Sequence, residues 1–151
     1  MGLGRVQVVA EALGLQAARK NSGVKVITFA GTNGKGPSIA ACQALITQPK
    51  ANARQTTTGV YTSPHVLKFN ERIMVNGTAC DDQQICDALS TVERTRQTIN
   101  SSSIHPEPVT LTYFEYTTLA ALWIFIQHDL DYWLLEIGLG GRLDAVSYTH
   151  L

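Results

Sequence analysis

The sequence predicts an α/β fold in which a parallel sheet carries helices on both faces. Three apolar segments, residues 24–30, 59–62 and 132–138, have the composition of buried strands. Helical patterns separate these segments, and such alternation indicates right-handed crossovers between parallel strands. A glycine-rich loop directly follows the first strand, where parallel sheets place their ligands.

Size and composition limit the class of protein. A chain of 151 residues with 44% apolar residues is long and apolar enough for one globular domain. Lys plus Arg and Asp plus Glu number 12 each, so we expect neither a nucleic-acid nor a membrane partner. Without a spanning run or a signal-peptide layout, we expect a cytoplasmic protein. The cysteines lack metal-ligand spacing, which favours reduced, partly buried thiols at Cys42, Cys80 and Cys86.

A first helix is expected before the first strand. The apolar residues Val6, Val9, Ala10 and Leu13 recur at helical spacing, and Gly14 is placed to end the helix. An amphipathic helix packed on the sheet explains these residues.

The loop after the first strand has the features of a phosphate-binding site. It consists of Gly31, Thr32, Asn33, Gly34, Lys35 and Gly36. Glycines let successive backbone N–H groups converge on phosphate oxygens, and the following helix directs its positive end to the same anion. Lys35 adds a mobile positive charge. The general Walker pattern has Ser or Thr directly after the lysine, whereas Gly36 and Pro37 precede Ser38 here. A glycine-rich turn with a surface lysine is the alternative.

The helix after this loop is expected over residues 38–46. Its apolar residues at helical spacing are Ile39, Cys42, Leu45 and Ile46. Pro49 then disfavours further helix in the preceding residue.

The second strand runs into Ser63, Pro64 and His65. A serine hydroxyl beside a rigid Ser-Pro bond is a plausible hard-oxygen ligand for Mg²⁺. His65 is equally well explained by a hydrogen bond to nearby backbone. Residues 72–77 alternate and then reach Asn-Gly, which predicts a β-hairpin.

Two further helices begin with capping-box spacing. Asp81 with Gln84 starts one, and Thr112 with Glu115 starts the other, which is expected to run to about His128. The buried face of the earlier helix is predicted to contain Ile85, Leu89 and Val92. Core positions of the later helix are predicted to be Leu119, Leu122, Trp123 and Ile126.

The third strand ends in Glu136. A carboxylate that closes an apolar strand beside a nucleotide loop is the Walker-B arrangement, in which the acid holds Mg²⁺. Taken alone, such a glutamate would be a surface residue.

Three stretches together resemble one known family. They are Ala30–Gly36, Ser63–His65 continued by Phe69–Arg72, and Gly138–Ala145. The chain resembles the folylpolyglutamate synthase and dihydrofolate synthase family, which belongs to the Mur-ligase group. Pro37 stands where that family usually carries Ser or Thr. The resemblance covers residues 1–145, about the first third of a family member.

The resemblance implies a fold, a reaction and a set of site residues. The fold would be the P-loop-type, Mur-ligase central ATP-binding domain. The reaction would be ATP-dependent addition of L-glutamate to dihydropteroate or folate through an acyl phosphate, with ATP and Mg²⁺ required. Lys35 would be catalytic, residues 31–36 with Ser38 would bind nucleotide, and Ser63 with Glu136 would hold the metal. The implied substrate-binding residues are Leu3, Thr112, Tyr113, Phe114, Glu115, Leu143, Asp144 and Ala145.

After Ala145 the resemblance stops. We therefore expect residues 1–145 to be a partial ATP-binding domain, residues 146–151 to be foreign or out-of-frame sequence, and the C-terminal ligase domain to be absent. Such a piece would be inactive, and its last strand would expose Trp133, Leu134 and Leu135 at an apolar edge. The full-length parent is expected to be a monomer. The alternatives are a nucleotide-binding module without turnover and a ligase acting on a cell-wall precursor.

Overall fold

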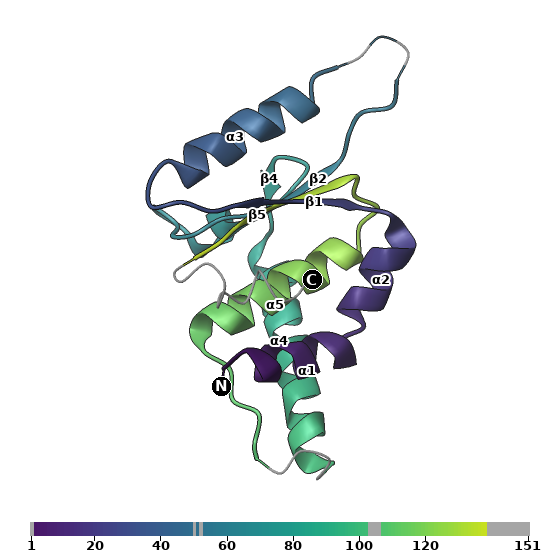
Figure 1. The fold of residues 1–151 in the computed structure, drawn as a ribbon, viewed down its shortest axis with the longest axis vertical. Coiled ribbons are helices and arrows are strands. Elements are labelled where there is room, and N and C mark those ends of the chain that lie inside the picture. Colours follow the sequence, from purple (N-terminus) through teal and green to yellow (C-terminus); the bar gives the residue numbers. More distant parts are fainter. Residues whose placement is uncertain (1, 50, 52, 103–106, 139–151) are drawn as a thin grey trace.

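The computed structural model describes residues 2–49, 51, 53–102 and 107–138 as a layered α/β structure. One helix, α3 (Lys35–Ile46), covers one face of a five-stranded sheet. The other four α-helices lie on the opposite side, with α5 (Tyr113–Ile126) against the sheet (Figure 1). The predicted placement of helices on both faces is confirmed.

The sheet is mixed, with the strand order β1-β5-β2-β3-β4. Its three parallel strands are β1 (Lys25–Phe29), β5 (Tyr132–Glu136) and β2 (Thr58–Tyr61). The predicted hairpin is present as β3 (Ile73–Val75) and β4 (Thr78–Ala79), which extend the sheet in antiparallel fashion. Its turn residues Asn76 and Gly77 have φ of 52° and 78°, the left-handed values that an Asn-Gly hairpin turn requires.

The expectation that the last strand forms an exposed apolar edge is wrong. β5 lies between β1 and β2, and Trp133, Leu134 and Leu135 are buried. The chain leaves β1, crosses over through α3 and returns as β2, which leaves space for one strand between β1 and β2. β5 later fills the position between them, so the order along the chain differs from the order in space.

The core consists of two apolar clusters separated by the sheet. On the α3 face, Ile39 packs with Val60 and Leu134. On the opposite face, Tyr61, Trp133 and Leu135 belong to a larger cluster with the helices. Neighbouring residues of β2 and β5 therefore point to opposite faces, as pleated strands require.

The helices confirm most of the predicted pattern. α1 (Gly2–Ala12) buries Val6, Val9 and Ala10 completely. Both capping boxes are present, one at the start of α4 (Asp82–Ser101) and one at the start of α5. A short 3-10 helix, η1 (Phe69–Arg72), precedes β3.

Three features differ from the sequence-based expectation. The sequence did not predict α2 (Leu15–Ser22), a polar helix in which only Leu15 is buried. α3 begins three residues before the predicted start at Ser38, and Leu45 on that helix is 66% exposed.

Among the described residues, no helix has the length and apolar character needed to cross a membrane.

All three cysteines are free thiols. Cys80 is buried, Cys42 is half-buried and Cys86 is exposed, so the expectation of partly buried thiols is wrong for Cys86. Burial raises the pKa of the Cys80 thiol above its ordinary value.

Candidate functional site

Lys35 stands where the glycine loop becomes α3. Gly34 immediately before it adopts a left-handed conformation with φ 78°, which glycine accepts without steric cost. The Lys35 ammonium donates a hydrogen bond of 2.9 Å to the Gly31 carbonyl oxygen. The same nitrogen lies 3.5 Å from Oε1 of Glu136, with which it forms an ion pair. The side chain therefore folds back over its own loop toward the end of β5.

Glu136 joins the glycine loop to Ser63, which lies two residues after the end of β2. It is the last residue of β5 and is 5% exposed. While Oε1 faces Lys35, Oε2 accepts a 2.9 Å hydrogen bond from the backbone N–H of Ser63. The loop after β1, the end of β5 and the segment after β2 thus meet at one carboxylate. They lie at the carboxyl ends of the parallel strands, where α/β folds bind ligands.

The glycine loop leaves open space at the N-terminus of α3. A Cβ atom at Gly34 or Gly36 would have no neighbour within 4 Å. Among the described residues, no side chain caps this helix end. The Ser38 hydroxyl instead donates a 2.8 Å hydrogen bond to the Gly34 carbonyl. Thr32 and Asn33 are exposed, so the loop surface faces solvent.

The segment after Ser63 is held by hydrogen bonds to two later side chains. The Glu71 carboxylate accepts backbone N–H groups from Val66, Leu67 and Lys68. These bonds, that from Val66 most of all, hold the pKa of Glu71 below its ordinary value. His65 has a side-chain partner in place of the backbone one that the alternative proposed, because its Nδ1 accepts a 2.8 Å hydrogen bond from Arg72 Nε.

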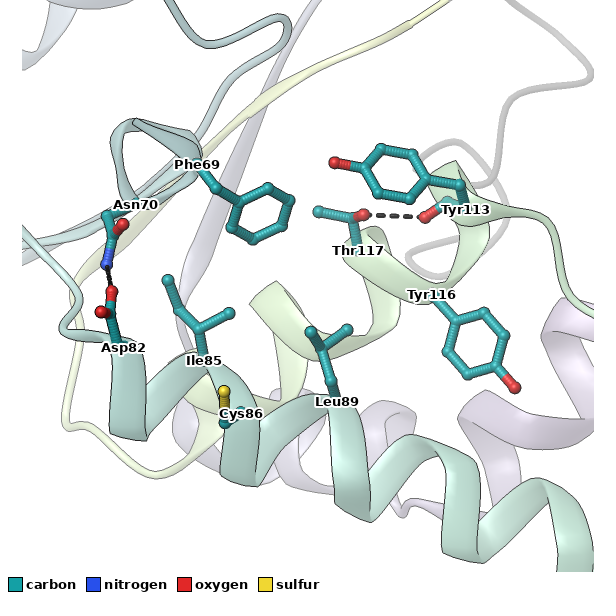
Figure 2. A pocket seen from close by; sticks show the side chains of 9 residues that line it. All are labelled: Phe69, Asn70, Asp82, Ile85, Cys86, Leu89, Tyr113, Tyr116 and Thr117. Atoms are coloured by element: carbon teal, nitrogen blue, oxygen red, sulfur yellow. Dashed lines mark hydrogen bonds between the residues drawn. The ribbon is translucent and has the colours of Figure 1, made fainter. Parts of the chain in front are cut away.

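A cavity of about 580 Å³ lies between η1, α4 and the start of α5 (Figure 2). Aromatic and aliphatic side chains form most of its wall, and the Asn70–Asp82 hydrogen bond lies at one end. Its lining residues are Phe69, Asn70, Asp82, Ile85, Cys86, Leu89, Tyr113, Tyr116 and Thr117.

Comparison with known proteins gives the fold and the site a family context. The chain is 38% identical over 147 residues to the dihydrofolate synthase/folylpolyglutamate synthase of Escherichia coli K12, covering 97% of this chain and 30% of that protein. No family model matches the chain. The chain belongs to the dihydrofolate synthase/folylpolyglutamate synthase family.

Solved structures of the family have the same fold. E. coli FolC in complex with DHPP and ADP is 36% identical with a TM-score of 0.77, over 97% of this chain and 31% of that one. A bifunctional folylpolyglutamate synthase/dihydrofolate synthase with Mn, AMPPNP and L-glutamate bound is 37% identical with a TM-score of 0.77, over 96% and 31% of the two chains. The chain therefore spans about 30% of the length of these relatives.

In this member of the synthase family, the predicted nucleotide and metal residues lie together. The loop of residues 31–36 reaches Glu136 through Lys35, and Ser63 reaches it through its backbone N–H. Among the described residues, no group of three or more His, Cys, Asp or Glu side chains could hold a metal ion alone.

The predicted substrate-binding residues at the start of α5 have different surroundings from one another. Thr112 and Glu115 bond reciprocally as a capping box, and Glu115 also pairs with Arg5 at 3.8 Å. Phe114 packs against Tyr61 with ring centroids 6.1 Å apart, whereas Tyr113 is 62% exposed and lines the cavity.

Four predicted substrate-binding residues cannot be placed in this way. Leu3 lies in α1, but its side chain is outside the described residues, as are Leu143, Asp144 and Ala145 entirely.

Sequence reasoning assigned no role to Glu71 and Arg72, although both hold the segment that follows Ser63. Glu71 accepts the Lys68 N–H three residues earlier, which is the spacing of one half of a capping box at the start of η1. The bonds from the Val66 and Leu67 N–H groups lie outside that pattern. Arg72 is 8% exposed. Its place directly before an apolar strand was the available signal that its guanidinium is buried and paired with other groups.

Proposed function

We propose that this chain supplies the nucleotide-binding part of an ATP-dependent ligase that joins L-glutamate to dihydropteroate or folate. The observation that carries the proposal is the meeting of Lys35, Glu136 and Ser63 at the ends of β1, β5 and β2. The names of the relatives supply the reaction, and their bound ADP, AMPPNP and Mn supply the ligand classes.

The glycine loop fits a nucleotide phosphate chain. Gly36 lies in the first turn of α3, where glycine costs roughly 0.5–1 kcal/mol relative to alanine. Because a Cβ there would meet no protein atom within 4 Å, packing within the described chain does not require glycine. Close approach of a ligand does explain it. The uncapped helix end and the Lys35 ammonium add positive charge at the same place.

Ser63 and Glu136 fit a magnesium ion that is shared with the nucleotide. Mg²⁺ in such enzymes takes one or two protein oxygens and completes its shell with phosphate oxygens and water. One buried carboxylate beside one serine matches this requirement, and it also accounts for the lack of a larger ligand cluster among the described residues.

The proposed division of work follows from these positions. ATP supplies the phosphoryl group that activates the substrate carboxylate toward the amine of glutamate. Lys35 neutralises charge on the phosphate side, and Glu136 with Ser63 fixes the metal. Leu3, Thr112–Glu115 and Leu143–Ala145 would contact the pterin-linked substrate. We infer a cytoplasmic protein whose full-length parent is a monomer. Residues 1–145 would form part of the ATP-binding domain, and residues 146–151 would be foreign to it.

The test compares Lys35→Ala with Lys20→Ala, which removes the same charge from an exposed position on α2. The full-length protein containing this sequence is assayed for glutamate-dependent release of ADP with dihydropteroate or folate. We expect Lys20→Ala to retain activity and Lys35→Ala to lose it, by 10²-fold or more as for other transition-state charge contacts. ATP–Mg²⁺ binding without glutamate-dependent turnover in the unmodified protein would instead identify a nucleotide-binding module.

A further inference from the structure

The loop that presents Ser63 is fastened by two consecutive residues, Glu71 and Arg72. The backbone at the loop's beginning and end is paired, because Thr62 N–H donates a 2.9 Å hydrogen bond to the Arg72 carbonyl. The loop between these positions includes Val66 and Leu67, whose side chains are 87% and 86% exposed. Burial of these two side chains therefore does not fix the shape of the loop.

The Glu71 carboxylate supplies the missing constraint. Its Oε2 accepts the N–H of Val66 at 2.7 Å, and its Oε1 accepts that of Lys68 at 2.8 Å. The Leu67 N–H lies 3.1 Å from Oε1 and 3.3 Å from Oε2. Three successive amides thus converge on one charged acceptor, which makes each hydrogen bond stronger than one to a neutral group. An amide side chain at position 71 would offer one oxygen in place of two.

Arg72 holds the beginning of the loop and connects it to α5. Its Nε donates to His65 Nδ1 at 2.8 Å, two residues after Ser63. The guanidinium carbon lies 5.7 Å from the ring centroid of Phe69 and 5.6 Å from that of Tyr113. A planar guanidinium between two rings is poorly replaced by a lysine ammonium, which has neither the plane nor the Nε donor.

We propose that Glu71 and Arg72 are positioning residues for Ser63 as a metal ligand, and that Arg72 links this ligand to Tyr113. The proposal rests on the proposed function, since it assumes that Ser63 and Glu136 share a metal with the nucleotide. Neither residue contacts Glu136 or Lys35, so both act through the shape of the loop. Supporting groups of this kind typically change metal affinity by about 10–100-fold when they are removed.

The experiment uses Glu71→Gln in the full-length protein, with Glu107→Gln as a control that removes one exposed carboxylate elsewhere. Amide hydrogen exchange is measured at residues 66–68, and Mn²⁺ is titrated at fixed ADP. In Glu71→Gln we expect faster exchange at these amides and about 10-fold weaker Mn²⁺ binding. Affinity for ADP without metal should remain unchanged, because the glycine loop is untouched. Glu107→Gln should match the unmodified protein.

Arg72→Lys is the second variant. It still tests the positioning role if Glu71→Gln fails to fold. It should also weaken Mn²⁺ binding while leaving metal-free ADP binding intact. Unchanged Mn²⁺ affinity in both variants would refute the positioning role. Unchanged Mn²⁺ affinity in one folded variant whose loop amides exchange faster would refute it as well. Neither result would affect the proposed function. Failure of the unmodified protein to bind Mn²⁺ with ADP would overturn the proposed function and this role with it.

Discussion

Gly59 offers a direct test of how β2 packs beneath α5. A Cβ atom at this position would lie 2.8 Å from Phe125 Cδ1 and 2.9 Å from Leu130 Cδ1, closer than carbon atoms approach. Phe125 is fully buried and Leu130 is 4% exposed, so neither side chain can move into solvent. Gly59→Ala therefore forces the strand and the helix apart.

The expected cost is that of overpacking, about 1–3 kcal/mol. In a domain of this size, each kcal/mol corresponds to a fall of roughly 2–4 °C in melting temperature. Because Ser63 follows β2 closely, movement of this strand should also weaken metal-dependent nucleotide binding.

Gly4→Ala is the matched control for this prediction. It adds the same methyl group in α1, where a Cβ meets nothing within 4 Å and the backbone is helical. We expect it to stabilise the protein by up to about 1 kcal/mol. Thermal unfolding followed by circular dichroism measures both variants. A melting temperature for Gly59→Ala equal to or above that of the unmodified protein would refute the packing of β2 against Phe125 and Leu130.

Three further predictions concern the site, acid stability and a helix cap. Glu136→Gln keeps an acceptor for the Ser63 N–H but loses the negative charge, so a Mn²⁺ titration with ADP should show metal binding weakened by 10-fold or more. Hydrogen bonding from Arg96 lowers the pKa of Glu93 from 4.5 to about 2, so the stability that Glu93 contributes is full above pH 4.5 and lost as pH falls toward 2. Urea unfolding should therefore separate Glu93→Gln from the unmodified protein at pH 7 but not near pH 2. Asp81→Ala removes the oxygen that caps Gln84 N–H and should cost about 1 kcal/mol in the same assay, whereas an unchanged midpoint would argue against the cap.

The sequence by itself predicted much of the local structure and proposed a chemical class for the site. Two helix starts could be predicted from the pairs Asp81–Gln84 and Thr112–Glu115, because the hydrogen bonds of a capping box lie within four consecutive residues. Asn76-Gly77 predicted the hairpin for the same reason, since the turn depends on the backbone freedom of its own residues. The glycine loop, Ser63 and Glu136 could be proposed as one site because parallel strands end at a common edge.

Only the tertiary structure decided which strand lies where and which partners the side chains have. Residues 133–135 are apolar whether β5 is central or at an edge, and pairing with β1 and β2 settled the matter. Arg72 meets Tyr113 in the same way, since these residues lie on distant segments that only the folded chain brings together. The Glu71 bonds are local, and the one from Lys68 has the spacing of a capping box. The added bonds from Val66 and Leu67 depend on the shape of the folded loop, which no sequence pattern records.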